Sequence, residues 1–476
     1  MKWIGYLMVF MVAGQLYAQK VTVSREILVR NNFNYDILPN IGQNTLFYHD
    51  RGSEQVFEVY DESLKFIGEV QPEFEVRNIQ PIAVVPTDTT FNFFYSYRDA
   101  GSIYTRVIGF NDKVELIDSL TISVRDKRKT NANARYVVSA DKSKVLLFTP
   151  LEKQILLQLV DNQNLRTIYE HTLQIDGINL RSEFDKIALT NHGEIFIITR
   201  KNSVWSRDKG KGFRLIHIKN DLQYIIKNFN PESGEITMLK LGYDEKNQRV
   251  ALGGLVSNSS EDAAIGYFGF SVPPAQIPDF AEIIINKFTQ DFIMEASGKV
   301  NKKLKELNDF RIKDMLIRYD GGIILLAEQT REFVRRSQMS NPAQFYSGLP
   351  TAGYVDYYNE NIILLATYPD GTGHWKQVLY KKQFSQDDNG VYSSYFLFQT
   401  PSRLRLLYND EIKSSNTVSE YVLDPTGNFE RKSVLSTEYQ NLKLRFRDAI
   451  QTGSSGIIVP SERNGRIYLV KIDYSL

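Results

Sequence analysis

Apolar and polar residues alternate along this chain in short runs, and each run ends at a cluster of turn-forming residues. Alternation with a period of two over about 4–8 residues is typical of half-buried β-strands. Phe and Tyr, which favour strands, are abundant, at 28 and 27 residues. In one representative stretch the pattern predicts four successive strands, at residues 79–85, 91–97, 103–110 and 114–122.

The same group of strands recurs along the chain at a nearly regular interval. The second of the well-defined strands in each repeat ends in a turn rich in Asp and Asn, which tolerate left-handed backbone and hydrogen-bond to it. The first three turns are 50 residues apart, the next follows after 59, and a later pair is 54 apart. These turns begin at Asp61, Asn111, Asp161, Asn220, Asp370 and Asp424. A strand-rich repeat of about 50 residues is typical of a β-propeller, in which each repeat forms one four-stranded blade.

The repeat predicts an all-β fold, a β-propeller of eight four-stranded blades. Seven blades is the alternative, because residues 236–310 keep the repeat poorly. The last repeat supplies three strands, at residues 446–450, 456–460 and 466–472. We therefore expect the strand at residues 20–29 to pair with them and close the ring, which removes two exposed sheet edges. One inserted helix is expected at residues 294–310, where Val300, Leu304 and Leu307 share a face. It would cap the ring or offer a docking surface.

The first residues have the pattern of a secretory signal peptide. Lys2 precedes an apolar run at residues 3–13, and Ala18 is a small residue at the expected cleavage point. The run is shorter than the ~20 residues that a membrane helix needs, and no later stretch reaches that length. We therefore expect a signal peptide at 1–18 and a single propeller domain at 19–476, without a transmembrane segment. The expected location is the periplasm or the outer membrane, with release outside the cell as the alternative.

Composition excludes several kinds of chemistry. The chain has no cysteine, so it has no disulfide, thiolate metal site or cysteine nucleophile. Its 57 basic and 56 acidic residues give a net charge of +1, and no nucleic-acid partner is expected. The five histidines lack metal-site spacing, and the nucleophile-elbow, P-loop and dinucleotide motifs are absent. The sequence therefore assigns no catalytic residue, metal ligand or cofactor.

The longest segments between strands, among them a loop at residues 329–356, are expected on one face of the ring, because second-to-third turns and links between blades share a face. We call this the long-loop face. Its segments are basic and contain tyrosines, a composition that suits a binding surface on a rigid scaffold, although solvated loops also carry such charge. The candidate binding residues are Arg128, Lys129, Arg207, Lys211, Arg331, Arg335, Arg336, Tyr346, Tyr354 and Tyr357.

The second half of the chain carries a set of local motifs. They are the segments 308–314 and 320–329, the tyrosine-rich run 354–358, Trp375, Lys381-Lys382-Gln383 and Ser393-Ser394-Tyr395. Together they resemble an uncharacterised family of exported, propeller-like proteins of Bacteroidota, over residues 283–476. The resemblance implies a location in the cell envelope. It brings no activity and no assigned site residues.

Two functions are expected from these features. The first is a non-enzymatic propeller that binds one or more envelope proteins through its long-loop face, as a scaffold subunit of a cell-envelope or outer-membrane assembly. The alternative is a propeller that binds or cleaves a glycan. No sequence motif supports catalysis, so binding is the preferred interpretation.

Overall fold

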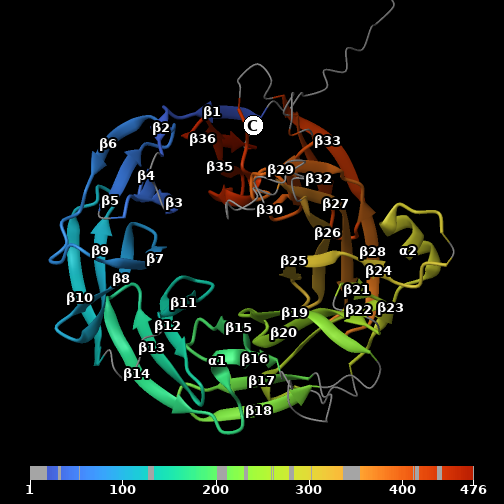
Figure 1. The fold of residues 1–476 in the computed structure, drawn as a ribbon, viewed down its shortest axis with the longest axis horizontal. Helices are drawn as coiled ribbons and strands as arrows, with labels where there is room; N and C mark the ends of the chain where they lie inside the picture. The colour runs from blue at the N-terminus through green and yellow to red at the C-terminus, as the bar shows by residue number, and fades with distance from the viewer. Residues whose placement is uncertain are drawn as a thin grey trace, which may run out of the picture.

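The computed structural model is a ring of eight antiparallel sheets arranged radially around one axis (Figure 1). The first strand of each blade lies nearest the axis and the last lies at the rim. The structure describes residues 19–474 apart from 30–33, 53, 127–132, 201–211, 230–233, 259, 261, 278–282, 302, 336–353, 411, 413–416 and 437–441. The predicted eight-bladed propeller is confirmed, and the alternative of seven blades is wrong.

The first four blades each contain four strands in sequence order. Blade one has β3 (Asn34–Ile41), β4 (Asn44–Asp50), β5 (Gln55–Tyr60) and β6 (Phe66–Val70). Blade two has β7 (Gln80–Pro86), β8 (Thr90–Asp99), β9 (Ser102–Asn111) and β10 (Leu116–Asp126). Blade three has β11 (Arg135–Val138), β12 (Lys144–Pro150), β13 (Gln154–Asp161) and β14 (Arg166–Gln174). After α1 (Leu180–Glu183), blade four has β15 (Phe184–Leu189), β16 (Ile195–Arg200), β17 (Phe213–Ile218) and β18 (Tyr224–Phe229).

The remaining blades carry the insertions. Blade five has β19 (Glu235–Asp244), β20 (Arg249–Ser257), β22 (Gly266–Val272) and β23 (Asn286–Lys287), with η1 (Pro274–Gln276) before β23. The short strands β21 (Ala263–Ala264) and β24 (Leu307–Asn308) form a separate two-stranded sheet. Blade six has β25 (Phe310–Ile317), β26 (Ile323–Arg335), β27 (Tyr354–Thr367) and β28 (Gly373–Leu379), and β29 (Gln383–Gln386) pairs with β27. Blade seven has β30 (Phe396–Gln399), β31 (Leu404–Asn409), β32 (Thr417–Leu423) and β33 (Phe429–Ser436). Blade eight has β34 (Ile450–Gln451), β35 (Gly456–Arg463) and β36 (Arg466–Asp473), preceded by η5 (Phe446–Asp448).

The ring is closed by the N-terminal strand, as predicted. Strand β1 (Lys20–Val23) pairs antiparallel with β36, with Lys20 opposite Asp473 and Val23 opposite Val470. Strand β2 (Ile27–Leu28) pairs further along β36. The fourth strand of blade eight therefore comes from the opposite end of the sequence. It covers the edge of β36, which would otherwise be exposed.

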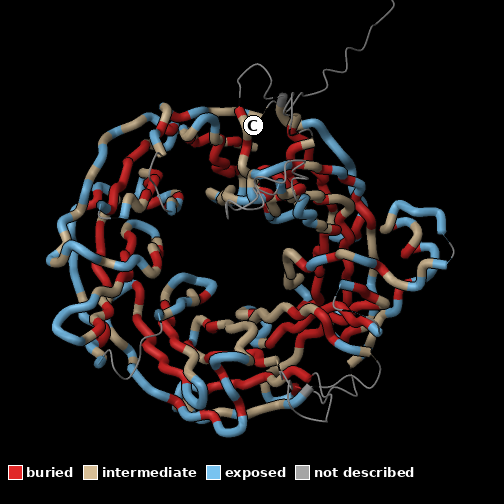
Figure 2. Tube along the Cα trace, viewed as in Figure 1, coloured by how far each residue is buried: buried red, intermediate tan, exposed pale blue. Residues whose placement is uncertain are grey.

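The core lies between neighbouring sheets, where buried residues follow each strand (Figure 2). Between blades one and two, Phe57 packs on Phe91 with ring centroids 5.0 Å apart, and Tyr48 meets Phe93 edge-on at 5.6 Å. Such aromatic contacts explain why the chain contains so many Phe and Tyr residues. Each blade thus depends on its neighbours for the burial of its faces.

The turns of the repeat are built by the predicted Asp and Asn residues. At Asp61 the Oδ1 atom accepts hydrogen bonds from the backbone N–H groups of Ser63 and Lys65, both at 2.9 Å. Asp424 does the same for Thr426 and Asn428, and hydrogen bonds, first of all the one from the Thr426 hydroxyl, lower its pKa to about 2. The side chain satisfies backbone donors that a tight turn leaves unpaired. This local chemistry is what made the repeat visible in the sequence.

The inserted helix exists, but its predicted bounds of 294–310 are wrong. Helix α2 (Gln290–Ser297) begins after Thr289, whose side chain accepts from the N–H of Phe292, and ends at Gly298, which adopts φ 64°. A left-handed glycine stops a helix, so the apolar residues beyond it belong to the chain leading into blade six. Phe292 and Ile293 are buried against the outer side of blades five and six, away from the ring axis. No helix in the described residues is long and apolar enough to cross a membrane.

Candidate functional site

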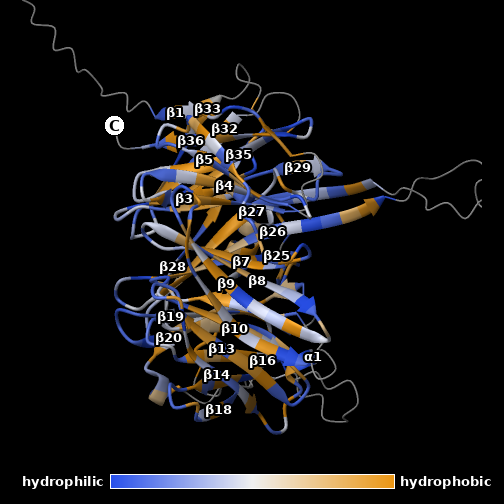
Figure 3. Cartoon of the chain, turned by 90° about the vertical axis from the view of Figure 1, so that its left-hand side faces the viewer, coloured by the Kyte–Doolittle hydropathy of each residue, from blue (hydrophilic) through white to orange (hydrophobic). Residues whose placement is uncertain are grey.

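Blade six extends far beyond its neighbours. The sequence predicted a loop at 329–356, but β26 continues to Arg335 and β27 begins at Tyr354. The extended parts, residues 330–335 and 354–359, form a ribbon that projects from the ring, and β29 pairs with residues 356–359 as a third strand at its base (Figure 3). We call this ribbon the arm. Its strands are held together by the Arg335–Asp356 ion pair and by Phe333 against Tyr358, with ring centroids 5.7 Å apart.

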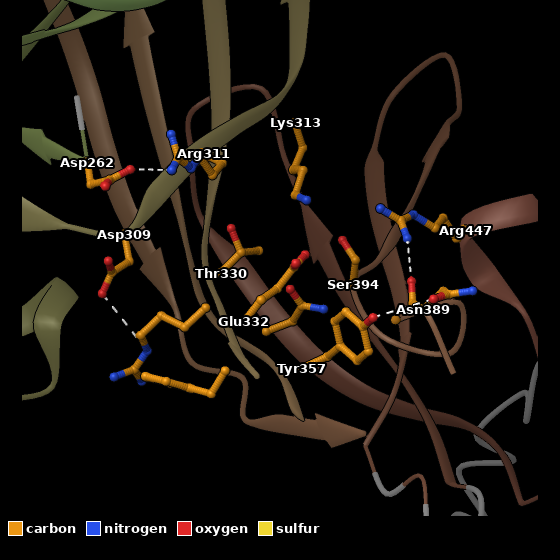
Figure 4. A pocket seen from close by; sticks show the side chains of 14 residues that line it. Asp262, Asp309, Arg311, Lys313, Thr330, Glu332, Tyr357, Asn389, Ser394 and Arg447 are labelled. Atoms are coloured by element: carbon orange, nitrogen blue, oxygen red, sulfur yellow. Dashed lines mark hydrogen bonds and ion pairs between the residues drawn. The ribbon is translucent and has the colours of Figure 1, made fainter. Parts of the chain in front are cut away.

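A pocket of about 730 Å³ lies at the base of the arm (Figure 4). Its walls come from the arm, from the inner strand β25, from the loop that follows β29 and from η5, with Asp262 contributed by blade five. A volume of about 300–1,000 Å³ is typical of sites for small molecules. The lining is mainly polar and charged, so the pocket suits a hydrophilic ligand rather than a lipid.

The loop after β29 is held in an unusual backbone conformation. Asn389 and Ser394 have φ values of 54° and 72°, and Asp309 across the pocket has 68°. Non-glycine residues rarely adopt such values, and they often cluster at functional sites. Asp388 fixes the loop, because its Oδ1 accepts from Ser385 Oγ and from the N–H of Gly390, both at 2.9 Å. The conformation turns Asn389 and Ser394 toward the pocket.

A buried ion pair supports the floor of the pocket. The side chains of Glu328 and Lys381 are completely buried, and Lys381 Nζ lies 2.7 Å from Glu328 Oε1. Lys381 Nζ also donates to Gln383 Oε1 at 2.7 Å, and Ser394 Oγ donates to Glu328 Oε2 at 2.6 Å. Burial lowers the pKa of Lys381, while the neighbouring Glu328 carboxylate opposes this shift. The pair therefore ties the loop bearing Ser394 to the central strands of blade six.

The cations of the pocket fall into two groups. Arg311 forms an ion pair with Asp262, and Arg331 forms one with Glu360 and lies 4.0 Å from Asp309. Lys313 and Arg447 form the second group: Lys313 Nζ lies 3.8 Å from Glu328 Oε2, and Arg447 donates to the backbone oxygen of Asn389. Within the described residues, no group of three or more His, Asp or Glu side chains is arranged to hold a metal ion.

The structure places four of the ten candidate binding residues. Arg331 and Tyr357 line the pocket, whereas Arg335 and Tyr354 lie further out on the arm. The other six lie outside the described residues: Arg128, Lys129, Arg207, Lys211, Arg336 and Tyr346. Sequence reasoning missed Lys313, Asn389, Ser394 and Arg447 as pocket residues. Only the run Ser393-Ser394-Tyr395 had been noticed, as part of a family resemblance.

Comparisons with known proteins do not identify a family for this chain. No protein-family model matches the chain, and no curated protein sequence matches it. The solved structures it is similar to include the Dos1 propeller, with 8% identity, 96% of each chain covered and a TM-score of 0.48. Others are an oligogalacturonate lyase in complex with manganese (10% identity, 95% of this chain and 98% of that one, TM-score 0.38) and a protein of unknown function from Bacteroides caccae (7%, 76% and 94%, TM-score 0.29). At such identities and TM-scores the likeness adds nothing to what the strand pairing shows, and the family resemblance stays a prediction.

Proposed function

We propose that this chain is an exported, non-enzymatic β-propeller that binds a protein partner, as a scaffold subunit of a cell-envelope or outer-membrane assembly. The contact surface is the arm. The observation that carries the proposal is the exposure of large apolar side chains on this projecting ribbon. Export rests on the signal-peptide pattern of residues 1–18, which lie outside the described residues.

The exposure on the arm is concentrated at its outer end. Phe333, Val334 and Tyr354 are 51%, 70% and 55% exposed. Beyond its pairing with β29, the outer end of the arm is a two-stranded ribbon, which is only marginally stable by itself in water. Aromatic anchors are enriched at the centres of protein interfaces. A partner with an apolar groove would cover these side chains and hold the ribbon. Arg335, half exposed beside them, adds a charged edge to the surface.

The proposal predicts that two substitutions on the arm abolish partner capture. In the V334S/Y354S variant, we expect recovery of envelope proteins with the tagged chain to fall at least tenfold, because the apolar anchors are lost. The matched control is L116S/I117S on the outer strand β10, where the replaced side chains are 65% and 55% exposed. Quantitative pull-down from envelope extracts measures the effect. Equal recovery with both variants would contradict the arm as the contact surface.

Glycan binding is the second candidate function, and the polar pocket at the base of the arm favours it. Val334 and Tyr354 do not line this pocket, so the arm variant leaves it intact. The two functions can therefore be tested independently on the same chain.

A further inference from the structure

Two cations of the pocket are left without a dedicated carboxylate partner. Lys313 Nζ lies 3.8 Å from Glu328 Oε2, but Glu328 is already neutralised by Lys381, and that oxygen already accepts from Ser394. Arg447 donates to the backbone oxygen of Asn389 at 2.9 Å, and no carboxylate of the described residues forms an ion pair with it. Elsewhere in the pocket, Arg311 and Arg331 are paired. The positive charge available to a ligand is thus concentrated at Lys313 and Arg447.

These two cations converge on one corner of the pocket. Figure 4 shows the Lys313 and Arg447 side chains, from β25 and η5, pointing toward the same space over Ser394 and Tyr357. Gly390 keeps this corner open, because a Cβ atom there would stand 3.5 Å from the Tyr357 ring and 3.9 Å from Arg447 Nη1. An anionic group placed there would meet a guanidinium and an ammonium together, the arrangement that proteins use for carboxylates and other oxyanions.

The rest of the lining selects among anionic ligands. Next to the cationic corner lie the carboxylate of Glu332, the amides of Asn359 and Asn389, and the hydroxyl of Thr330. Within the described residues, Glu332 has neither an ion pair nor a side-chain hydrogen bond. The Glu332 carboxylate beside these two cations would repel a ligand that carries only negative groups. It suits a ligand that also has hydroxyl groups, because these can donate hydrogen bonds to it. Tyr357 adds an aromatic wall, on which the apolar face of a sugar ring can pack.

We infer that the pocket binds an acidic saccharide, with the carboxylate of a uronic-acid residue at Lys313 and Arg447 and sugar hydroxyls at Glu332 and the amide side chains. The pocket volume of about 730 Å³ lies in the range of ligand pockets and suits a short oligosaccharide of this kind. This binding is separate from the protein contact of the arm. It does not require cleavage of the saccharide.

The inference is tested by calorimetry on the full chain with trisaccharides of galacturonic, glucuronic and mannuronic acid. At least one is expected to bind, and its methyl ester, which lacks the charge, is expected to bind at least tenfold more weakly. The K313Q and R447Q variants should each weaken binding at least tenfold. The control K299Q removes an exposed lysine next to α2, outside the pocket, and should leave the affinity unchanged.

Three outcomes would overturn the inference. The first is no binding of any of the three uronate trisaccharides, and the second is equal binding of acid and ester. The third is tighter binding of a hexaglutamate peptide or a sulfated galactose trisaccharide, which would make the pocket a site for acidic peptides or sulfate. Thermal melts of each variant confirm that it is folded. The V334S/Y354S arm variant should still bind the saccharide, so failure of the protein-binding proposal is distinguishable from failure of this one.

Discussion

Replacing Lys381 by methionine is expected to lower the free energy of unfolding by about 3 kcal/mol at pH 7, since the removal of one partner of a buried ion pair typically costs 3–5 kcal/mol. The Glu328 carboxylate would remain without its closest counter-charge, in a position where its side chain is completely buried. Lys313, 3.8 Å from the other carboxylate oxygen and one-third exposed, compensates in part, which places the effect at the lower end of the range. Chemical denaturation followed by tryptophan fluorescence measures it.

The double variant E328Q/K381M separates charge from packing. Glutamine keeps an acceptor for Ser394 Oγ, and neither side chain is charged, so most of the lost stability should return. Two results would contradict a stabilising role of the buried ion pair. The first is a free energy of unfolding of K381M within about 1 kcal/mol of the native value, and the second is a double variant no more stable than K381M.

The propeller architecture was predictable because the turn-forming residues that define each blade act locally and recur at a regular spacing. Asp61, Asn111 and Asp424 each form the same turn with their own backbone, so their spacing reports the blade period directly. Ring closure followed from counting strands in the last repeat. The bounds of the inserted helix were not predictable from apolar periodicity, because Gly298 ends the helix through its backbone conformation while Val300 and Leu304 continue the pattern.

The pocket could be predicted only in part, because its residues come together through the fold. Arg331 and Tyr357 were found since they belong to one long, basic and tyrosine-bearing insertion. Lys381 lies in a Lys-Lys-Gln run that reads as surface, and it is buried only because β29 folds back against β27. Arg447 lies in a segment read as a strand, whereas the structure forms the short turn η5 there. No local pattern indicates that Lys313 and Arg447, 134 positions apart, face one space.

Removal of the N-terminal strand that closes the ring is the second change for which we expect a large loss of stability. A chain that begins at Asn34 lacks β1 and β2, and we expect it to lose at least about 3 kcal/mol of stability relative to a chain that begins at Gln19. Val21 packs in the core of blade eight, and Ser24 exchanges hydrogen bonds with Leu469, donating through its N–H and accepting at its Oγ, both at 2.9 Å. The deletion also exposes the edge of β36, so concentration-dependent association is expected. Thermal melts and light scattering at several protein concentrations measure the two effects.

A peptide added in trans distinguishes closure from nonspecific damage. The exposed edge of β36 is a template for an extended strand, so a synthetic peptide of residues 19–29 should bind the truncated chain and restore its melting temperature. Ile27 of the same peptide would fill the space between blades eight and one, against Phe47 and Leu469. A peptide of scrambled sequence is the control and should do neither. If the truncated chain melts like the longer one, or if both peptides act alike, β1 and β2 do not stabilise the ring through specific pairing with β36.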